Sequence, residues 1–265
     1  MRKFTVFFTR QWLLVTLLVL AAIIGMARLG FWQLDRLDQR RAYNARVRIQ
    51  LQATTLELTG SVLGTDLTGM EYRSVIVTGQ YDFANQVALR NQAYHLLYGA
   101  HLLTPLKIAG SDVAVLVDRG WIPQESFLSG SWDRFNEAGL VQVHGVIRLA
   151  ESKPQFGRIT DPVPAPGEPA LRSWNLANIE AIARQVPYTL LPVYIQKSTD
   201  PQNPPPPYPD TAAMTMPFPV DPALDLTEGN HFSYALQWFV YAFILMVGYM
   251  VFVFSTGQKK TPAML

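Results

Sequence analysis

The stretch NHFSYALQWFVYAFILMVGYMVFVF, residues 230–254, decides the fold class of this chain. From Phe232 to Phe254 it contains no charged residue. Its length matches the roughly 20 apolar residues that cross the hydrocarbon core of a bilayer. The stretch therefore predicts a transmembrane helix over residues 231–254.

The polar residues of this stretch gather at its start. On a helix, His231, Tyr234 and Trp238 share one face, because residues three and four positions apart lie above one another. Two interpretations stay open. Tyr and Trp favour the headgroup level of a membrane, where a histidine is simply solvated. Alternatively, the imidazole of His231 binds a ligand at the membrane boundary.

A second uncharged run, Trp12–Ala27, follows three basic residues and predicts a further membrane segment over residues 11–31. Gly25-Met26-Ala27 would suit cleavage of a signal peptide. The helical pattern continues beyond this point, however, with no Gly or Pro from Phe31 to Thr59. This continuity favours a retained anchor whose helix projects out of the bilayer.

Positive charges predict the orientation, because Lys and Arg that flank a span stay in the cytoplasm. Lys259 and Lys260 follow the second span, whereas no Lys or Arg lies between Lys197 and that span. The arginines after the first span carry less weight, since a long domain translocates largely regardless of charge. We therefore expect residues 1–10 and 255–265 in the cytoplasm and residues 32–230 in the periplasm. The chain would then be integral to a bacterial inner membrane, in contact with lipid.

Composition excludes several functions. The 265-residue chain has a formal net charge of +2 and only 16% charged residues, without the basic cluster that a nucleic-acid partner requires. It contains no cysteine, which excludes disulfides, thiolate nucleophiles and cysteine-ligated metal sites.

The external segment predicts an α+β domain that is mainly antiparallel β and barrel-like, with two short helices. Helices are expected over residues 124–137 and 175–186, the second capped by Asn175 or Asn178. Gly145 suggests a β-bulge, and the Pro-rich residues 200–222 suggest an extended, semi-rigid spacer. Alternating or β-branched runs predict strands at residues 72–79, 86–91, 98–108, 113–117, 140–149 and 190–196.

Catalytic motifs are missing from the sequence, which has no Gly-x-Ser-x-Gly elbow, no His-Glu-x-x-His and no phosphate loop. We therefore expect no enzymatic activity and no catalytic residues. His95 and His101 could meet on adjacent strands, but neither has a carboxylate at a suggestive spacing. No metal site of this kind is expected.

Two polar motifs each have a structural and a functional interpretation. In Asp118-Arg119-Gly120-Trp121, Arg119 would satisfy a neighbouring carboxylate, Gly120 would allow an unusual backbone angle, and Trp121 would fill core. The same four residues could instead form a binding surface. Arg73, beside Tyr72, is either structural or a clamp for a carboxylate.

Five segments, in order from the first span to the second, resemble the surfeit-locus-protein-one family of cytochrome oxidase assembly factors. They read LGFWQLDR at residues 29–36, YR at 72–73 with GQYD at 79–82, GAHLLTPL at 99–106, VDRGWIP at 117–123 and NHFSYALQWF at 230–239. The resemblance implies a non-enzymatic membrane protein that helps to build haem-copper oxidases. It also implies three partners, namely the oxidase catalytic subunit, other assembly factors and haem a synthase.

The resemblance further implies that haem a is bound by a histidine at the start of the second span and delivered to the catalytic subunit. That position is His231, while Gly99 and Tyr234 match a family glycine and tyrosine. Haem iron accepts a neutral imidazole, so His231 would be the axial ligand and Tyr234 and Trp238 would supply flat contact area. A scaffold that never touches haem remains the alternative, and a tethered hydrolase is disfavoured. The candidates for binding the haem propionates are Arg28, Arg36 and Arg119.

Overall fold

A computed structural model of the chain describes residues 10, 12–153, 160–162, 164–165, 168–202 and 214–258. The chain divides into two compact units. One, the helical unit, comprises residues 1–46 and 225–265, and the other, the β domain, comprises residues 47–224. Each unit is described by itself.

The helical unit contains two long helices, α1 (Leu13–Gln52) and α4 (His231–Gln258). The last residues of α1, from Val47 onward, are counted with the β domain. Both helices are long and apolar enough to cross a membrane, which confirms the two long apolar helices of the predicted fold class. α1 runs without interruption past Ala27, as expected of a stretch that lacks Gly and Pro beyond Phe31.

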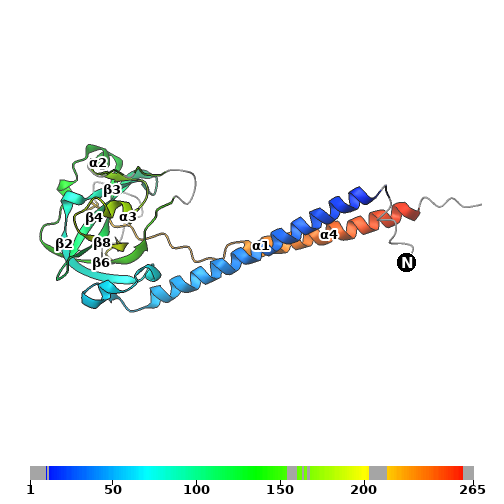
Figure 1. Cartoon of the computed structure of the whole chain (residues 1–265), viewed down its shortest axis with the longest axis horizontal. Coiled ribbons are helices and arrows are strands. Elements are labelled where there is room, and N and C mark those ends of the chain that lie inside the picture. The colour runs from blue at the N-terminus through cyan, green and yellow to red at the C-terminus, as the bar shows by residue number, and fades with distance from the viewer. Residues whose placement is uncertain are drawn as a thin grey trace, which may run out of the picture. The chain divides into compact units, whose positions relative to one another are not determined.

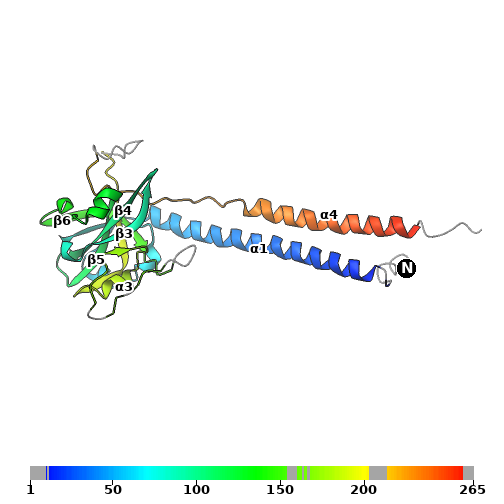
Figure 2. The ribbon, with the colours of Figure 1, turned by 90° about the horizontal axis from the view of Figure 1, so that it is seen from above.

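The two helices of the helical unit lie side by side and antiparallel (Figures 1 and 2). Near the start of α1, the ring of Trp12 meets the ring of Phe252 edge-on at 5.7 Å. About five turns further along α1, Phe31 meets Phe239 in the same way at 5.2 Å. Antiparallel packing places the beginning of α1 and the end of α4 at the same end of the pair.

Small residues let α1 and α4 approach closely. Ala235 and Ala242 on α4 are only 1% and 7% exposed. On α1, a Cβ atom added to Gly30 would lie 2.7 Å from Cζ of Phe239. Small side chains at such contacts are typical of helix pairs in membranes, where van der Waals packing replaces the hydrophobic effect.

The described residues of the β domain form an eight-stranded sheet in the order β1-β2-β6-β8-β5-β4-β3-β7, and an additional β2–β4 pairing closes five of these strands into a ring (Figure 1). The strands are β1 (Leu56–Glu57), β2 (Ser74–Tyr81), β3 (Val87–Tyr94), β4 (Leu97–Ile108), β5 (Val113–Pro123), β6 (Leu140–Leu149), β7 (Ser173–Trp174) and β8 (Thr189–Lys197). Among them lie the short helices α2 (Gln124–Ser129) and α3 (Ile179–Ala183) and the 3-10 turns η2 (Gly60–Gly64), η3 (Thr68–Met70), η4 (Phe83–Asn85) and η5 (Asp133–Phe135).

The mainly antiparallel, barrel-like domain predicted from the sequence is confirmed. Antiparallel pairing joins β2 to β4 and β6, β4 to β3 and β5, and β6 to β8. Parallel pairing joins β1 to β2, β3 to β7 and β5 to β8. The β3–β7 and β5–β8 pairs connect segments far apart in the sequence, which local patterns do not reveal.

The main core lies inside the ring of strands. In β2, buried residues alternate with more exposed ones, so that Val75, Val77 and Tyr81 point inward. In β5, by contrast, every residue from Ala114 to Ile122 is buried. Both faces of β5 are covered, because Val115 and Val117 join the main core while Leu116 joins a second cluster with α3.

Several boundaries differ from the predictions. The helix predicted at residues 124–137 ends at Ser129, because Gly130 takes the left-handed conformation (φ 67°) that terminates helices. The helix predicted at 175–186 is the shorter α3, and Asn178 is its cap, accepting a hydrogen bond from the N–H of Ala181 at 3.1 Å.

The bulge predicted at Gly145 is wrong. Gly145 pairs in regular register with Val75 on one side and Lys197 on the other. A Cβ atom there would collide with the carbonyl oxygen of Gln196, so the glycine permits close strand approach.

The Pro-rich segment lies partly outside the described residues, since residues 203–213 are not among them. Its described end is part of the β domain. Phe218 exchanges two backbone hydrogen bonds with Trp121, at 2.7 and 2.8 Å, and is only 8% exposed. The prediction of a spacer therefore does not hold for this end of the segment.

Candidate functional site

His231 is the first residue of α4, and Gly229 precedes it in a left-handed turn with φ 65°. The Nδ1 atom of His231 lies 2.8 Å from Oε1 of Gln33 on α1. An amide oxygen only accepts, so Nδ1 of His231 is the donor in this hydrogen bond, and in a neutral imidazole the lone pair then lies on Nε2. An imidazole in that tautomer can bind a metal through Nε2.

Hydrogen bonds and ion pairs connect residues 225–228, the segment before α4, to α1. Arg41 forms two hydrogen bonds with the carboxylate of Glu228, both at 2.9 Å. Arg40 donates to the carbonyl oxygens of Thr227 and Asp225, at 3.0 and 2.6 Å. The hydrogen bonds that Thr227 donates to the Asp225 carboxylate, helped by the charge of Arg40, lower the pKa of that carboxyl group. The segment leading into His231 is therefore held against α1.

A cavity of about 440 Å³ opens beside His231. Its volume falls within the ~300–1,000 Å³ usual for small-molecule and cofactor sites. Guanidinium groups next to an imidazole suit a ligand that combines a metal with anionic groups. The cavity is lined by Arg36, Gln39, Arg40, Tyr43, Asp225, Thr227, Glu228, Gly229 and His231.

The other two residues predicted for this site lie elsewhere on α4. Tyr234 is 48% exposed, and Trp238 meets Tyr241 edge-on with ring centroids 6.3 Å apart. Among the described residues, neither belongs to the lining of the His231 cavity. The structure instead adds Arg40, Gln33 and Tyr43, which only the packing of α1 against the α4 segment could reveal.

His101 and Asp118 form a buried pair in the β domain that the sequence analysis missed. Nδ1 of His101 lies 2.8 Å from Oδ2 of Asp118, whose Oδ1 accepts from the N–H of Gly120 at 3.0 Å. Burial acts to lower the pKa of His101, but the Asp118 carboxylate outweighs it, so that pKa is raised. The two residues meet because β4 and β5 pair with an irregularity next to His101.

Arg119 is completely buried in the β domain. It donates to Oε1 of Gln86 at 3.1 Å, to Oε1 of Glu137 at 3.0 Å and to the carbonyl of Phe135. The carboxylate that satisfies Arg119 is thus Glu137, which agrees with the structural interpretation of this motif. Arg119 is therefore not exposed to a propionate.

Gly120, Trp121 and Gly99 have structural roles in the β domain, as their close contacts show. Gly120 has φ 127°, and a Cβ there would lie 2.6 Å from the nitrogen of Pro219. Trp121 is 0% exposed, and a Cβ on Gly99 would lie 2.5 Å from its Nε1. Among the described residues, Arg73 donates to the carbonyl of Thr54 at 3.3 Å and not to a carboxylate.

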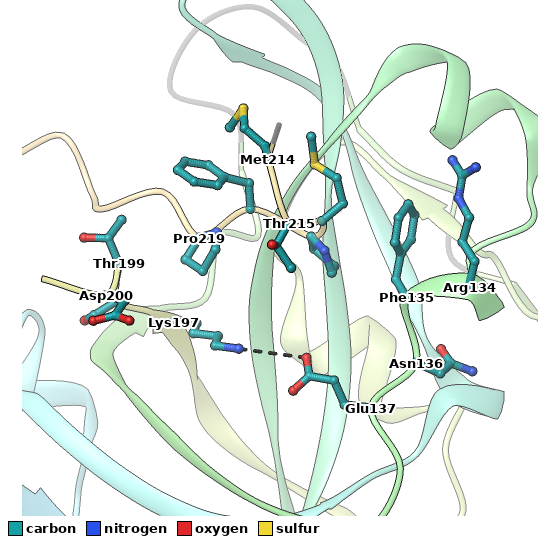
Figure 3. A pocket seen from close by; sticks show the side chains of 14 residues that line it. Arg134, Phe135, Asn136, Glu137, Lys197, Thr199, Asp200, Met214, Thr215 and Pro219 are labelled. Atoms are coloured by element: carbon teal, nitrogen blue, oxygen red, sulfur yellow. Dashed lines mark ion pairs between the residues drawn. The ribbon is translucent and has the colours of Figure 1, made fainter. Parts of the chain in front are cut away.

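A second cavity, of about 740 Å³, lies in the β domain (Figure 3). Lys197 and Glu137 point toward each other there, with Nζ and Oε1 3.9 Å apart. The described lining contains no histidine and so offers no imidazole ligand. Within the described residues, no group of three His, Asp or Glu side chains is placed to hold a metal ion.

Comparison with known proteins agrees with the motifs. The sequence profile of the SURF1 family matches residues 20–243. Surfeit locus protein 1 of Mus musculus is 26% identical over 188 residues, covering 66% of this chain and 57% of the mouse protein. The SURF1-like protein of Caenorhabditis briggsae is 24% identical over 193 residues, covering 66% and 59%. The SURF1-like protein of Monosiga brevicollis is 26% identical over 246 residues, covering 88% and 85%.

The chain thus spans less than two thirds of the length of the nematode and mouse relatives. The profile match nevertheless covers most of the chain and includes the whole ring of strands, α1 from the end of its second turn onward, and the first half of α4. This chain belongs to the SURF1 family.

Proposed function

We propose that this protein is a non-enzymatic assembly factor for haem-copper (cytochrome c) oxidase. It binds haem a as cargo through His231 at the outer membrane face and assists insertion of the haem into the catalytic subunit. The observation that carries the proposal is the imidazole of His231, whose Nδ1 lies 2.8 Å from Oε1 of Gln33, an arrangement in which a neutral imidazole keeps its lone pair on Nε2.

The residues around His231 fit this cargo. Haem iron accepts a neutral imidazole nitrogen, which Nε2 of His231 would supply. The propionates carry negative charge, and Arg36, which the structure does not pair with a carboxylate among the described residues, lines the same cavity. Of the three arginines considered from the sequence, Arg36 is the one in that lining, whereas Arg119 is buried in the β domain.

The apolar tail of haem a suits the surroundings of the cavity. Large apolar side chains near this level are well exposed, with Phe31 at 60%, Trp32 at 51% and Phe232 at 60%. Tyr234 and Trp238, one and two turns along α4 from His231, are proposed to contact the edge of the macrocycle or its tail.

The proposed location is a bacterial inner membrane, with both termini in the cytoplasm and the β domain in the periplasm. Lys259 and Lys260 after α4 and the antiparallel pairing of α1 with α4 support this orientation. The proposed partners are the oxidase catalytic subunit, other oxidase assembly factors and haem a synthase.

The test is an absorption spectrum of protein purified from cells that make haem a. We expect a Soret band in the wild type that His231→Ala removes, because the nitrogen that would bind the iron is lost. The matched control is His144→Ala, which removes an exposed histidine of β6 in the β domain. Oxidase activity, measured after each variant is returned to a deletion strain, should fall for His231→Ala and not for His144→Ala.

Two results would contradict the proposal. A colourless wild-type protein that restores oxidase activity would favour the alternative, a scaffold that never binds haem. Normal oxidase activity in the deletion strain would contradict a role in oxidase assembly altogether.

A further inference from the structure

The hydrogen bond between Gln33 and His231 joins residues 198 positions apart, and the packing around it holds both partners in place. On one side of this bond, Phe31 packs against Phe239. On the other side, Asn44 donates to the carbonyl of Leu226 at 2.8 Å. The position of the Gln33 amide beside the imidazole therefore follows from the helix packing.

The partner of Nδ1 determines how an imidazole behaves as a metal ligand. A hydrogen-bond acceptor at one ring nitrogen fixes the tautomer and the orientation of the ring. An ionised acceptor makes a stronger bond than a neutral one and raises the basicity of the ligand nitrogen further. A carboxylate at position 33 would thus make His231 a stronger donor to iron than the amide does.

Carboxylates are close to His231, yet each is engaged elsewhere. Asp225 and Glu228 line the same cavity. Oδ2 of Asp225 is paired with Arg40 at 3.2 Å, and Oε2 of Glu228 with Arg41 at 2.9 Å. The imidazole bonds instead to the neutral amide of Gln33.

From this arrangement we propose that Gln33 is a positioning residue that sets the strength with which His231 holds its haem cargo. Its amide oxygen fixes Nε2 as the ligand nitrogen and, being neutral, leaves that nitrogen a weak enough donor for the cargo to be released. This inference rests on the proposed haem-binding function. Gln33 acts through His231 and is not itself a ligand.

The experiment compares full-length wild-type protein with Gln33→Glu and Gln33→Leu, all loaded with haem a. Release of haem is followed by transfer to excess apomyoglobin. The iron–histidine stretching band and the midpoint potential report on donor strength independently of assembly activity. Gln237→Leu is the matched control, because Gln237 is an exposed glutamine of α4.

Gln33→Glu should release haem about 10-fold more slowly, raise the iron–histidine frequency and lower the midpoint potential. Gln33→Leu should weaken haem affinity by about 10–100-fold, the usual cost of removing such a partner, and lower the frequency. Gln237→Leu should match the wild type. Gln33→Glu keeps the size of the side chain, so it remains informative if Gln33→Leu does not fold.

Wild-type values for release, frequency and potential in both Gln33 variants would overturn this inference. A Soret band that still depends on His231 would, in that case, leave the proposed function intact. A wild-type protein that takes up no haem would overturn both.

Discussion

At Gly99, a single methyl group would collide with the neighbouring strand. A Cβ there would lie 2.5 Å from Nε1 of Trp121 and closer still to the carbonyl oxygen of Ile122. Neither of these buried groups has room to move away. The requirement for glycine at this position is therefore steric, and it concerns the closing of β4 against β5.

Gly99→Ala should lower the free energy of unfolding by about 1–3 kcal/mol, the usual cost of overpacking. The measurement is denaturant unfolding of purified protein followed by the fluorescence of the buried tryptophans. Gly64→Ala is the control, since a Cβ there would meet nothing within 4 Å. Equal stability of the two variants would contradict the steric explanation.

The His101–Asp118 pair predicts a pH dependence of stability. The pKa of His101 is raised in the folded protein above its ordinary 6.5, since the attraction of Asp118 exceeds the effect of burial. The contribution of the His101–Asp118 pair to the free energy of unfolding is therefore complete when the pH lies below the ordinary pKa of histidine. It is lost as the pH rises through the raised pKa of His101.

The destabilisation caused by His101→Gln should accordingly be larger at about pH 5.5 than at about pH 9. Unfolding free energies of the wild type and the variant, measured across this range, check the sign. His144→Gln controls for the loss of an exposed histidine. A destabilisation that grows with pH would show that the charged form of His101 is not the stabilising one.

The roles of single residues were predictable from the sequence where the residue type itself has a distinctive physical property. The structural interpretation of Gly120 and Trp121 was available from the sequence, because glycine permits positive φ and tryptophan fills volume. The partners of Asp118 and Arg119 were not available. The register of β4 and β5 places Asp118 beside His101, and the segment that follows β5 places Glu137 beside Arg119.

At the scale of elements, the close packing of α1 on α4 is the feature that positions His231. Gly30 lies against the ring of Phe239, and the Gln33–His231 bond is less than one turn further along α1. Any side chain that separates the helices at Gly30 should therefore also displace Gln33 from the imidazole.

Gly30→Val should destabilise the purified protein by about 1–3 kcal/mol through overpacking. Phe239→Ala in the same chain should restore part of this loss, because the added side chain then occupies the space of the ring. Thermal unfolding in detergent of the two single variants and the double variant completes the cycle. Additive losses would mean that the two residues do not touch.

Helices and strands could be predicted where a short stretch of sequence carries the pattern that specifies them. The two apolar helices follow from the absence of charge over the length of a bilayer, and β2 follows from its alternation of buried and exposed residues. The parallel pairing of β5 with β8 did not follow, since it depends on contacts between residues about 75 positions apart. The pairing of Phe218, near the end of the Pro-rich segment, with Trp121 was missed because a Pro-rich composition is typical of a spacer.

At the scale of the whole molecule, the proposed topology has a direct test, because the chain contains no cysteine. Asp112→Cys places a single thiol in an exposed turn between β4 and β5, and Ser255→Cys places one near the end of α4. A membrane-impermeant maleimide should label intact spheroplasts at position 112, and at position 255 only after lysis.

The reverse labelling pattern would place the β domain in the cytoplasm and overturn the proposed delivery of haem at the outer face. Labelling of both positions in intact spheroplasts would mean that α1 and α4 do not both span the membrane. The cysteine-free wild type, treated in the same way, shows any labelling that does not depend on the introduced thiol.

The sequence by itself determined the class of this protein, with two apolar helices around a strand-rich domain and a histidine at the start of the second helix. Charge, hydrophobic periodicity and the special geometry of glycine are local properties, and short stretches carry them. Only the tertiary structure decided what surrounds His231, since Gln33 and Arg36 reach it across nearly 200 positions of chain. Which side chains face each other over such separations depends on helix packing and strand register, and these are settled by all the contacts together.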